Sequence, residues 1–530
     1  MKQINRLWTT TLLMGLAFDI LFWKKTPGVS FAVFVTLLLS SGIFLLVSDG
    51  FRPAWRSLLL LAPIAFFAVM TFVRAEPMST FLNYVLTLTF MIVFALCYRG
   101  GRWLSYSISD YVAGFFKLGY SALVRPVELI VETRKQREEE DGDERGDKKV
   151  WPILRGVLIA LPVVAVFTAL LVSADLIFAQ RVEAFFDLLR LENLPEFIFR
   201  SIYIFFIGYV LVGVLLHAAH KSEDEKLIGE EKPLIPPFLG FTETSIVLGS
   251  VIVLFALFVA VQFQYFFGGQ ANINLEGYTY AEYARRGFGE LVVVAFFSLL
   301  LLLGLSYITR RAEKRQRNTF TGLVIALVLL VLVMLVSAFR RLMLYEAAYG
   351  FTRMRIYPHV YMIWLGVLLI GVAVLEILQH QRAVALAMVF ASVGFAATLN
   401  LLNVDAFIVR QNVARSADVD GEELDVAYLA SLSYDAVPTM AASFNDGALS
   451  PENHEGVGAA LVCHQHINED RLDETRPWQS FHLARWRAAR VYDRLDDQLD
   501  GYTILDEEWP VTVISPSGAS FICQESFAWD

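Results

Sequence analysis

The sequence predicts an all-α polytopic membrane protein with about 11 transmembrane helices and a small, mainly helical (α+β) C-terminal domain. Of its 530 residues, 56% are hydrophobic and only 18% are charged, whereas soluble proteins carry about 25% charged residues. Its apolar runs are near 20 residues long, and a helix of that length crosses a hydrocarbon core of about 30 Å. Helices satisfy their own backbone groups there, as the lipid interior requires.

Eleven apolar runs are the expected spans. They lie near residues 8–23, 28–48, 57–73, 81–98, 152–173, 197–219, 242–266, 288–308, 319–338, 359–378 and 384–403. The first run follows Lys2 and Arg6 as in a signal peptide, but Phe22 to Lys25 offers no small-residue cleavage site. We therefore interpret it as a retained first helix.

Charge divides the chain into two parts. From Asp405 to Asp530 there are 23 acidic residues, 8 arginines and no lysine, a net charge of −15. The remainder has 30 acidic and 36 basic residues, a net charge of +6. Neither part shows the clustered basic face with interleaved aromatics that is typical of nucleic-acid binding, so no nucleic-acid partner is expected.

The cationic links predict the orientation. With the N-terminus in the cytoplasm, the inner links hold 23 Lys and Arg and the outer links hold 11, as the positive-inside rule requires. Eleven spans then place the C-terminal domain on the extracytoplasmic side of the plasma membrane. Cys463 and Cys523 are the only cysteines of that domain. Either they form a possible disulfide, as extracytoplasmic cysteines do, or they are two unrelated buried thiols.

The expected organisation has four parts. They are 1–131 (helices 1–4 and an interfacial helix near Ser107–Leu123), a disordered cytoplasmic loop at 132–149, helices 5–11 in 150–403, and an acidic domain at 404–530. The loop packs 8 acidic and 6 basic residues into 18 positions, which is typical of disorder. In Leu176–Arg190, apolar residues fall on one helical face and polar residues on the opposite face, which predicts a second interfacial helix.

The acidic domain is expected to be a compact helical cap. Helices are predicted at Glu422–Leu432, Glu455–His466 and Ser480–Leu499, and Thr503–Ile514 and Ser520–Ser526 are predicted to be short strands. Pro451 and Pro477 are helix-start signals.

Two outer links contain arginines where the rule predicts few. The candidate binding residues are Tyr280, Glu282, Tyr283, Arg285 and Arg286 in one link, and Arg341, Tyr345, Tyr349, Arg353 and Arg355 in the other. In a helix, Arg341, Tyr345, Tyr349 and Arg353 would form one stripe at i, i+4 spacing.

Two accounts of these arginines remain open. In the structural account, Tyr lies at the membrane interface, Arg stacks on it, and Glu–Arg pairs join helices. In the binding account, the planar Arg forks hold a phosphate or carboxylate. Candidate partners, besides the lipid bilayer itself, are an anionic lipid, an envelope protein or polymer, and the chain's own acidic C-terminal domain, which needs no external ligand.

Three blocks carry a family resemblance: Tyr278–Leu291, Met343–Arg355 and Asn403–Pro438. They resemble the bacterial polytopic family catalogued as domain of unknown function 4173, with its relative 4153. The likeness covers roughly residues 195–440. It implies an integral membrane protein without an established activity, and it supplies no catalytic residues.

Other candidate chemistry is sparse. Cys463, His464 and His466 cannot point three ligands at one ion from a helix, and there is no phosphate loop or hydrolase motif. No metal, cofactor or catalytic residue is predicted, and whether the protein is an enzyme stays open. Inside the spans, Asp19 is expected to pair with Lys24, and Glu376 to reach the interface.

Three functions are compatible with these features. The first is binding or scaffolding on the outer face of the membrane. The second is transport of an anionic or lipid-linked substrate. The third is envelope signalling, with the 132–149 loop as a docking segment.

Overall fold

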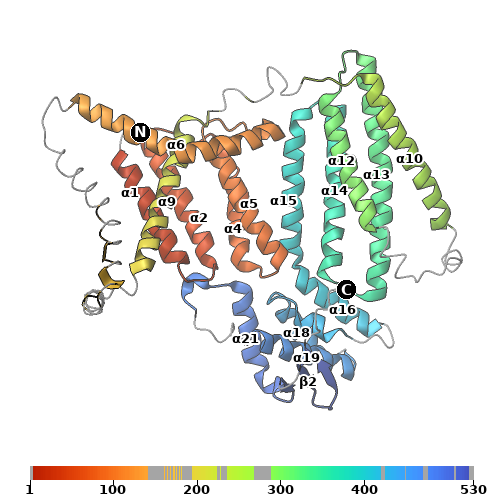
Figure 1. The fold of residues 1–530 in the computed structure, drawn as a ribbon. Coiled ribbons are helices and arrows are strands. Elements are labelled where there is room, and N and C mark those ends of the chain that lie inside the picture. The colour runs from red at the N-terminus through yellow and green to blue at the C-terminus, as the bar shows by residue number, and fades with distance from the viewer. Residues whose placement is uncertain are drawn as a thin grey trace. The chain divides into compact units, whose positions relative to one another are not determined.

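The computed structural model is a helical protein, drawn in Figure 1, in which nine of the described helices are long and apolar enough to cross a membrane. The structure describes residues 4–140, 194–223, 236–267, 288–418, 424–447, 449–469, 476–506 and 509–523, with Leu227 and scattered positions from 160 to 181. The candidate spans in this part are Val29–Ser48, Trp55–Val73, Pro77–Leu96, Leu194–His220, Phe241–Gln262, Gly289–Ile308, Lys314–Tyr349, Arg353–Ile377 and Gln381–Leu402. The predicted fold class, a polytopic helical membrane protein with a small sheet near its C-terminus, is confirmed.

The other two predicted spans have different outcomes. All but the last residue of the predicted span 8–23 lie in helix α1 (Ile4–Phe22), which is not among the nine candidates. Most of residues 152–173 lie outside the described residues, as does most of the predicted interfacial helix Leu176–Arg190.

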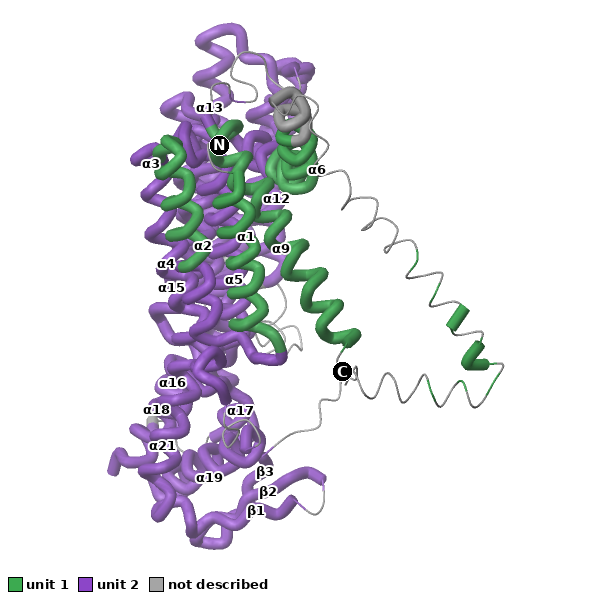
Figure 2. Tube along the Cα trace, turned by 90° about the vertical axis from the view of Figure 1, so that its left-hand side faces the viewer, with its two compact units in different colours: residues 1–23, 37–52, 116–222 green, residues 24–36, 53–115, 223–530 purple. Residues whose placement is uncertain are grey.

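The chain divides into two compact units, coloured separately in Figure 2. Residues 1–23, 37–52 and 116–222 form the first unit. In it α1 packs along α9 (Leu194–His220). Gly15 permits this packing, because a Cβ at that position would lie 2.5 Å from the carbonyl oxygen of Ile204. Small residues at such crossings let two membrane helices approach closely.

The second unit contains most of the membrane helices. They are α3 (Trp55–Leu58), α4 (Leu61–Val73), α5 (Pro77–Leu96), α10 (Phe241–Phe267), α12 (Phe288–Ile308), α13 (Lys314–Tyr349), α14 (Arg353–Ile377) and α15 (Val384–Leu402). Contacts run in series from α4 to α5, α15, α14 and α13, and α13 also contacts α10 and α12. Asn83 of α5 and Asn400 of α15 exchange side-chain hydrogen bonds at 3.0 and 2.8 Å, and both are fully buried. This pairing satisfies two amides inside the helix pack.

Within the second unit, the connections lie at two opposite ends of the helices. The C-terminal residues contact one end: Val29 N–H donates to the Phe481 carbonyl (2.9 Å), and Ala75 N–H donates to Asp435 (2.6 Å). The other ends of the same helices carry a basic set, namely Arg56, Arg99, Arg102, Arg310, Arg311, Lys314, Arg315, Arg317 and Arg382. The predicted alternation of basic and less basic links therefore matches the course of these helices.

Helix α6 (Ile108–Glu140) corrects one prediction. Residues 132–140 continue this helix, where a disordered loop was expected from 132 to 149; the rest of that loop lies outside the described residues. The physical reason is that Glu, Arg, Lys and Gln are good helix formers.

The C-terminal residues build a small domain on α16 (Val404–Asp418). It contains α17 (Val426–Ala430), α18 (Val437–Phe444), α19 (Pro451–Ile467), α21 (Leu483–Leu499) and the antiparallel sheet β1-β2-β3 (Thr503–Leu505, Thr512–Ile514, Ser520–Ile522). Helix α19 is the centre of the core, with Val457, Ala459, Ala460 and Leu461 all 0% exposed. The predicted stretch Thr503–Ile514 is a hairpin of two strands, and α16 and α18 were not predicted as helices.

Candidate functional site

The two arginine-containing links have different outcomes in the structure. Tyr280, Glu282, Tyr283, Arg285 and Arg286 lie outside the described residues. The second link is described in full and consists mostly of helix. Helix α13 runs to Tyr349, and α14 begins at Arg353.

Gly350 overturns the predicted stripe of four residues. Arg341, Tyr345 and Tyr349 lie on the last turns of α13, but Gly350 ends that helix with φ +76°. This left-handed region favours glycine, which commonly terminates helices. Arg353 therefore starts a new helix and does not continue the face of Arg341.

Arg353 forms a bidentate ion pair with Asp405 of α16. Its Nε donates to Oδ1 at 2.7 Å and its Nη2 to Oδ2 at 2.6 Å, and Asp405 is 0% exposed. The Ser433 backbone N–H donates to the same carboxylate at 2.8 Å. The parallel geometry is the strong form of an Arg–carboxylate contact. It fastens the first turn of α14 to the start of the C-terminal domain.

Tyr428 adds a further contact at the same place. Its hydroxyl accepts from the Arg353 backbone N–H at 2.8 Å, so one of the unsatisfied N–H groups at the start of α14 gains a partner. Burial raises the pKa of Tyr428 to about 12. The hydroxyl therefore stays protonated and neutral at physiological pH.

A second ion pair joins the α4–α5 turn to the domain. Asp435 accepts from the backbone N–H groups of Ala75 (2.6 Å) and Glu76 (3.2 Å), and it lies 3.5 Å from the Arg74 guanidinium. Burial raises the pKa of Asp435, whereas its hydrogen bonds and Arg74 act in the opposite direction. Glu76 in turn caps α5 through the N–H groups of residues 78 and 79, and Tyr357 of α14 donates to it.

We call these six residues, Arg74, Glu76, Arg353, Asp405, Tyr428 and Asp435, the arginine–carboxylate network. Sequence reasoning found Arg353 but missed the other five. A signal for Asp405, Tyr428 and Asp435 was present, because all three lie within the block Asn403–Pro438. Arg74 and Glu76 lay in a short link that gave no pattern.

Around Gly350, side chains of α16 bind the backbone. Asn412 accepts from the Phe351 N–H (2.6 Å) and donates to its carbonyl (2.9 Å). Arg415 donates to the last carbonyls of α13, at Ala347 and Ala348, both at 3.0 Å. These bonds satisfy carbonyl groups that a helix end leaves without partners. A polar pocket of about 100 Å³ lies beside them.

Arg355 and Arg341 make other contacts. The Arg355 guanidinium lies 4.3 Å from the centre of the Tyr345 ring and donates to the carbonyl oxygens of Tyr349 (2.8 Å) and Gly350. Arg341 is half-buried on α13. Of the arginines predicted in this link, Arg353 and Arg355 therefore both contact groups of their own chain: Arg353 contacts the start of the acidic C-terminal domain, and Arg355 contacts its own link.

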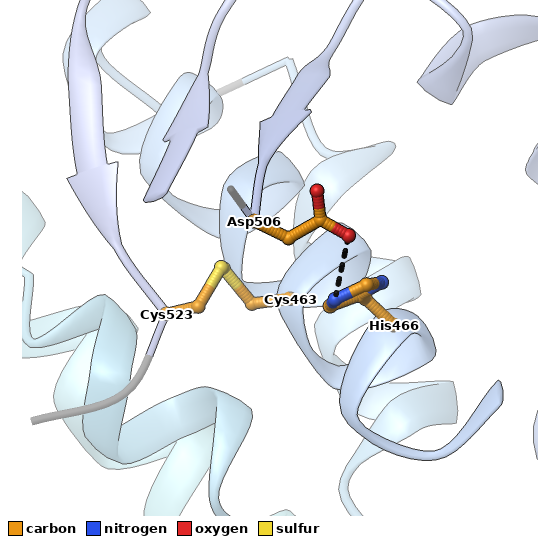
Figure 3. The surroundings of a disulfide bond; sticks show 4 residues. All are labelled: Cys463, His466, Asp506 and Cys523. Atoms are coloured by element: carbon orange, nitrogen blue, oxygen red, sulfur yellow. Dashed lines mark ion pairs between the residues drawn. A yellow bond between two sulfur atoms is a disulfide. The ribbon is translucent and has the colours of Figure 1, made fainter. Parts of the chain in front are cut away.

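Cys463 and Cys523 are joined in a disulfide, shown in Figure 3, with an S–S distance of 2.02 Å. It links α19 to the end of β3, and both residues are 0% exposed. His466 lies beside it, 4.0 Å from Asp506. Among the described residues, no group of three or more His, Cys, Asp or Glu could hold a metal ion.

Two further ion pairs hold a carboxylate of a long helix, one in each unit. In the first unit, Asp19 of α1 accepts from Arg200 of α9 (2.9 and 2.5 Å) and from Tyr203; only a pair with Lys24 was predicted for it. In the second unit, Glu376 of α14 pairs with Arg311 and is 4% exposed, where a side chain reaching the interface was predicted. Buried ions in a membrane need such partners.

Comparison with known proteins shows the family to which the chain belongs. The family model described as Domain of unknown function (DUF4153) matches residues 61–443. Neither the curated proteins nor the solved structures gave a match. The match begins well before residue 195, where the resemblance read from the sequence began, and it includes the α4–α5 turn that carries Arg74 and Glu76. Of the two families that the resemblance named, the one that this match shows is 4153. The chain belongs to the family of domain of unknown function DUF4153.

Proposed function

We propose that this chain is a protein of the bacterial plasma membrane that holds its C-terminal domain on the outer face, where the domain binds or scaffolds a protein of the cell envelope. Two observations support this orientation. The helix ends opposite the domain carry the basic residues, as cytoplasmic ends do. The domain contains the Cys463–Cys523 disulfide, and such bonds persist outside the cytoplasm.

The arginine–carboxylate network is the observation that carries the proposal. It fixes the domain to three helix ends through Arg353–Asp405 and Arg74–Asp435. A domain held in this way presents a constant surface. That surface includes exposed tryptophans, Trp478 and Trp509 (each 60% exposed) and Trp486 (45%). Tryptophan dominates the binding energy of many protein interfaces, so a protein partner fits this surface better than a small anion.

Site-specific photo-cross-linking in cells tests the proposal. A benzophenone amino acid at Trp509 is expected to give a discrete protein adduct, whereas the same probe at Phe297, an exposed position of the membrane helix α12, gives none. In an Arg353→Gln background the Trp509 adduct should fall to a small fraction, because the domain is no longer fixed, while the protein and its disulfide accumulate.

Two outcomes would contradict this proposal. Equal cross-linking from Trp509 and Phe297 would leave no partner on the domain. Loss of the protein itself in Arg353→Gln would assign the network to folding alone, as the structural account predicts.

A transporter of an anionic or lipid-linked substrate is the second candidate. It is favoured by the buried Arg311–Glu376 pair beside a cavity of about 430 Å³ at the end of the helices opposite the domain. Substrate flux into proteoliposomes that stops in Glu376→Gln would support it. Unchanged flux in that variant would exclude a route through this site.

A further inference from the structure

A cavity of about 430 Å³ lies among the helices of the second unit, at the end opposite the C-terminal domain. Helices α12, α13, α14 and α15 and the beginning of α6 line it. Its volume is in the range of about 300–1,000 Å³ that is typical of ligand sites.

The walls of the cavity are apolar. Leu302, Val324, Val372 and Ala385 are at most 6% exposed, and each belongs to a different candidate membrane span. The cavity therefore lies among membrane helices. An aqueous ligand would lose its hydration against such walls, whereas a hydrocarbon chain would lose nothing.

One end of the cavity is polar and firmly built. Glu376 accepts from the Ser306 hydroxyl at 2.9 Å and pairs with Arg311. Arg311 also donates to the Ser306 carbonyl at 2.5 Å, and its guanidinium lies 4.1 Å from the centre of the Phe320 ring. Desolvating an ion pair is costly, and ionisable groups within membrane helices usually mark a functional site.

The surroundings of the polar end favour an anionic headgroup. Arg382 lines the cavity directly, and Arg310, Lys314, Arg315 and Arg317 belong to the same end of the helices. Cations near a membrane surface attract anionic lipid. Arg382 can bind a phosphate through its planar fork.

The first turns of α6 border the cavity with apolar side chains that the described residues leave about half exposed. Ile108 is 46% and Val112 is 53% exposed, and both also line the cavity. They are spaced i, i+4 and so lie on one face of the helix. Apolar side chains that are exposed beside membrane helices are compatible with lipid, which gives an acyl chain a route into the cavity.

We propose that this cavity binds an anionic membrane phospholipid, with one acyl chain between Leu302, Val372 and Ala385 and the headgroup phosphate at Arg382. The Arg311–Glu376 pair forms the polar floor beside the glycerol region. This site is separate from the arginine–carboxylate network at the other helix ends. It stands whether or not the C-terminal domain binds a partner.

Native mass spectrometry of the full-length protein in mild detergent tests the proposal. Phosphatidylglycerol is compared with phosphatidylcholine of identical chains. The wild type is expected to retain one phosphatidylglycerol with about tenfold preference. Val372→Trp, which fills the cavity, should lose that lipid. Val374→Trp is the matched control, because Val374 lies on the same helix, is 45% exposed and does not line the cavity.

Arg382→Gln separates the headgroup from the chain. This variant should abolish the preference for phosphatidylglycerol and leave phosphatidylcholine retention as in the wild type. Equal retention of lipid by Val372→Trp and Val374→Trp would overturn the site, and equal retention of both lipids by the wild type would overturn the anionic headgroup.

A second measurement needs no variant and so does not depend on how Val372→Trp folds. Phosphatidylglycerol with a diazirine on its acyl chain should cross-link to peptides that contain Leu302–Tyr307 or Val384–Ala385 of the wild type. Cross-links distributed evenly over lipid-facing peptides, such as those around Phe297, would contradict a defined site.

Discussion

At the scale of the residue, the C-terminal domain contains a fully buried titratable side chain, the imidazole of His464. It is 0% exposed, and its Nδ1 lies 2.8 Å from the Tyr492 hydroxyl. Burial lowers the pKa of His464 to about 4, while the nearby Leu432 backbone and Asp405 act in the opposite direction. The domain therefore folds around a neutral imidazole.

This shift predicts how stability depends on pH. Between about pH 6.5 and 4 the unfolded chain binds a proton at His464 that the folded chain does not bind, so stability falls as the pH is lowered through this window. The free energy of unfolding should fall by about 2 kcal/mol from pH 7 to pH 5 on this account. Thermal unfolding of the purified full-length protein at the two pH values measures it.

The control separates His464 from the other titrating groups. His464→Gln should lose this part of the pH dependence, whereas His466→Gln, on the same helix and less buried, should retain it. If all three proteins show the same difference between pH 7 and pH 5, His464 is not the responsible group.

The sequence was sufficient to predict which kind of group Arg353 binds, but not which residue supplies that group. Arg353 was marked because its outer link contains more arginines than the positive-inside rule predicts. An arginine side chain in turn indicated a carboxylate or phosphate partner. The partner, Asp405, is 52 positions away, and Asp435 binds residues about 360 positions away. Such separations are set by the fold of the whole unit, and a single sequence contains no measure of them.

At the scale of the element, α14 and α15 approach closely because Gly394 lacks a side chain. A Cβ at Gly394 would overlap the Trp364 ring, whose Nε1 donates to Thr398 of α15 at 3.0 Å. Gly371 of α14 is an informative contrast, since its added Cβ would meet its nearest neighbour at 3.9 Å. The two glycines differ in the room available for a side chain, whereas their helix propensity is the same.

Gly394→Ala should therefore destabilise the protein and Gly371→Ala should not. Displacing Trp364 is an overpacking change with a cost of about 2 kcal/mol, whereas Ala in an open helix position is neutral or stabilising. The thermal unfolding midpoints of the two variants in the same detergent provide the comparison. Equal midpoints would mean that the α14–α15 contact adjusts without cost.

The elements that could be predicted are those with a strong local signal. Runs such as Val29–Ser48 are apolar throughout, so their existence follows from the composition alone. The extension of α13 to Tyr349 was missed, because polar residues after 338 resembled a link and only Gly350 ends the helix. Helix α18 is eight residues long and gave too short a pattern to predict.

At the scale of the whole molecule, the sign of charge along the chain matches the ends of the helices in the second unit. The C-terminal residues, at −15, lie at one end of these helices, and Arg310 to Arg317 lie at the other. The difference in charge between the links was therefore sufficient to predict which links lie at the same end of these helices. It could not predict that Asp405 and Asp435 of the acidic domain pair with Arg353 and Arg74, which requires the folded geometry.

The orientation of this arrangement across the membrane is open to a direct labelling test. Asp497 of α21 and Lys314 of α13 are both exposed, and they belong to opposite ends of the second unit. In a Cys97→Ser background, Asp497→Cys should react with an impermeant maleimide in intact cells with a permeabilised outer membrane, and Lys314→Cys should react only after lysis. The reason is energetic, since translocating the five cations between Arg310 and Arg317 across the bilayer would oppose the positive-inside rule, whereas the acidic domain carries no such bias. Labelling of Lys314→Cys before lysis, with Asp497→Cys protected, would place the domain in the cytoplasm and remove the basis for an envelope partner.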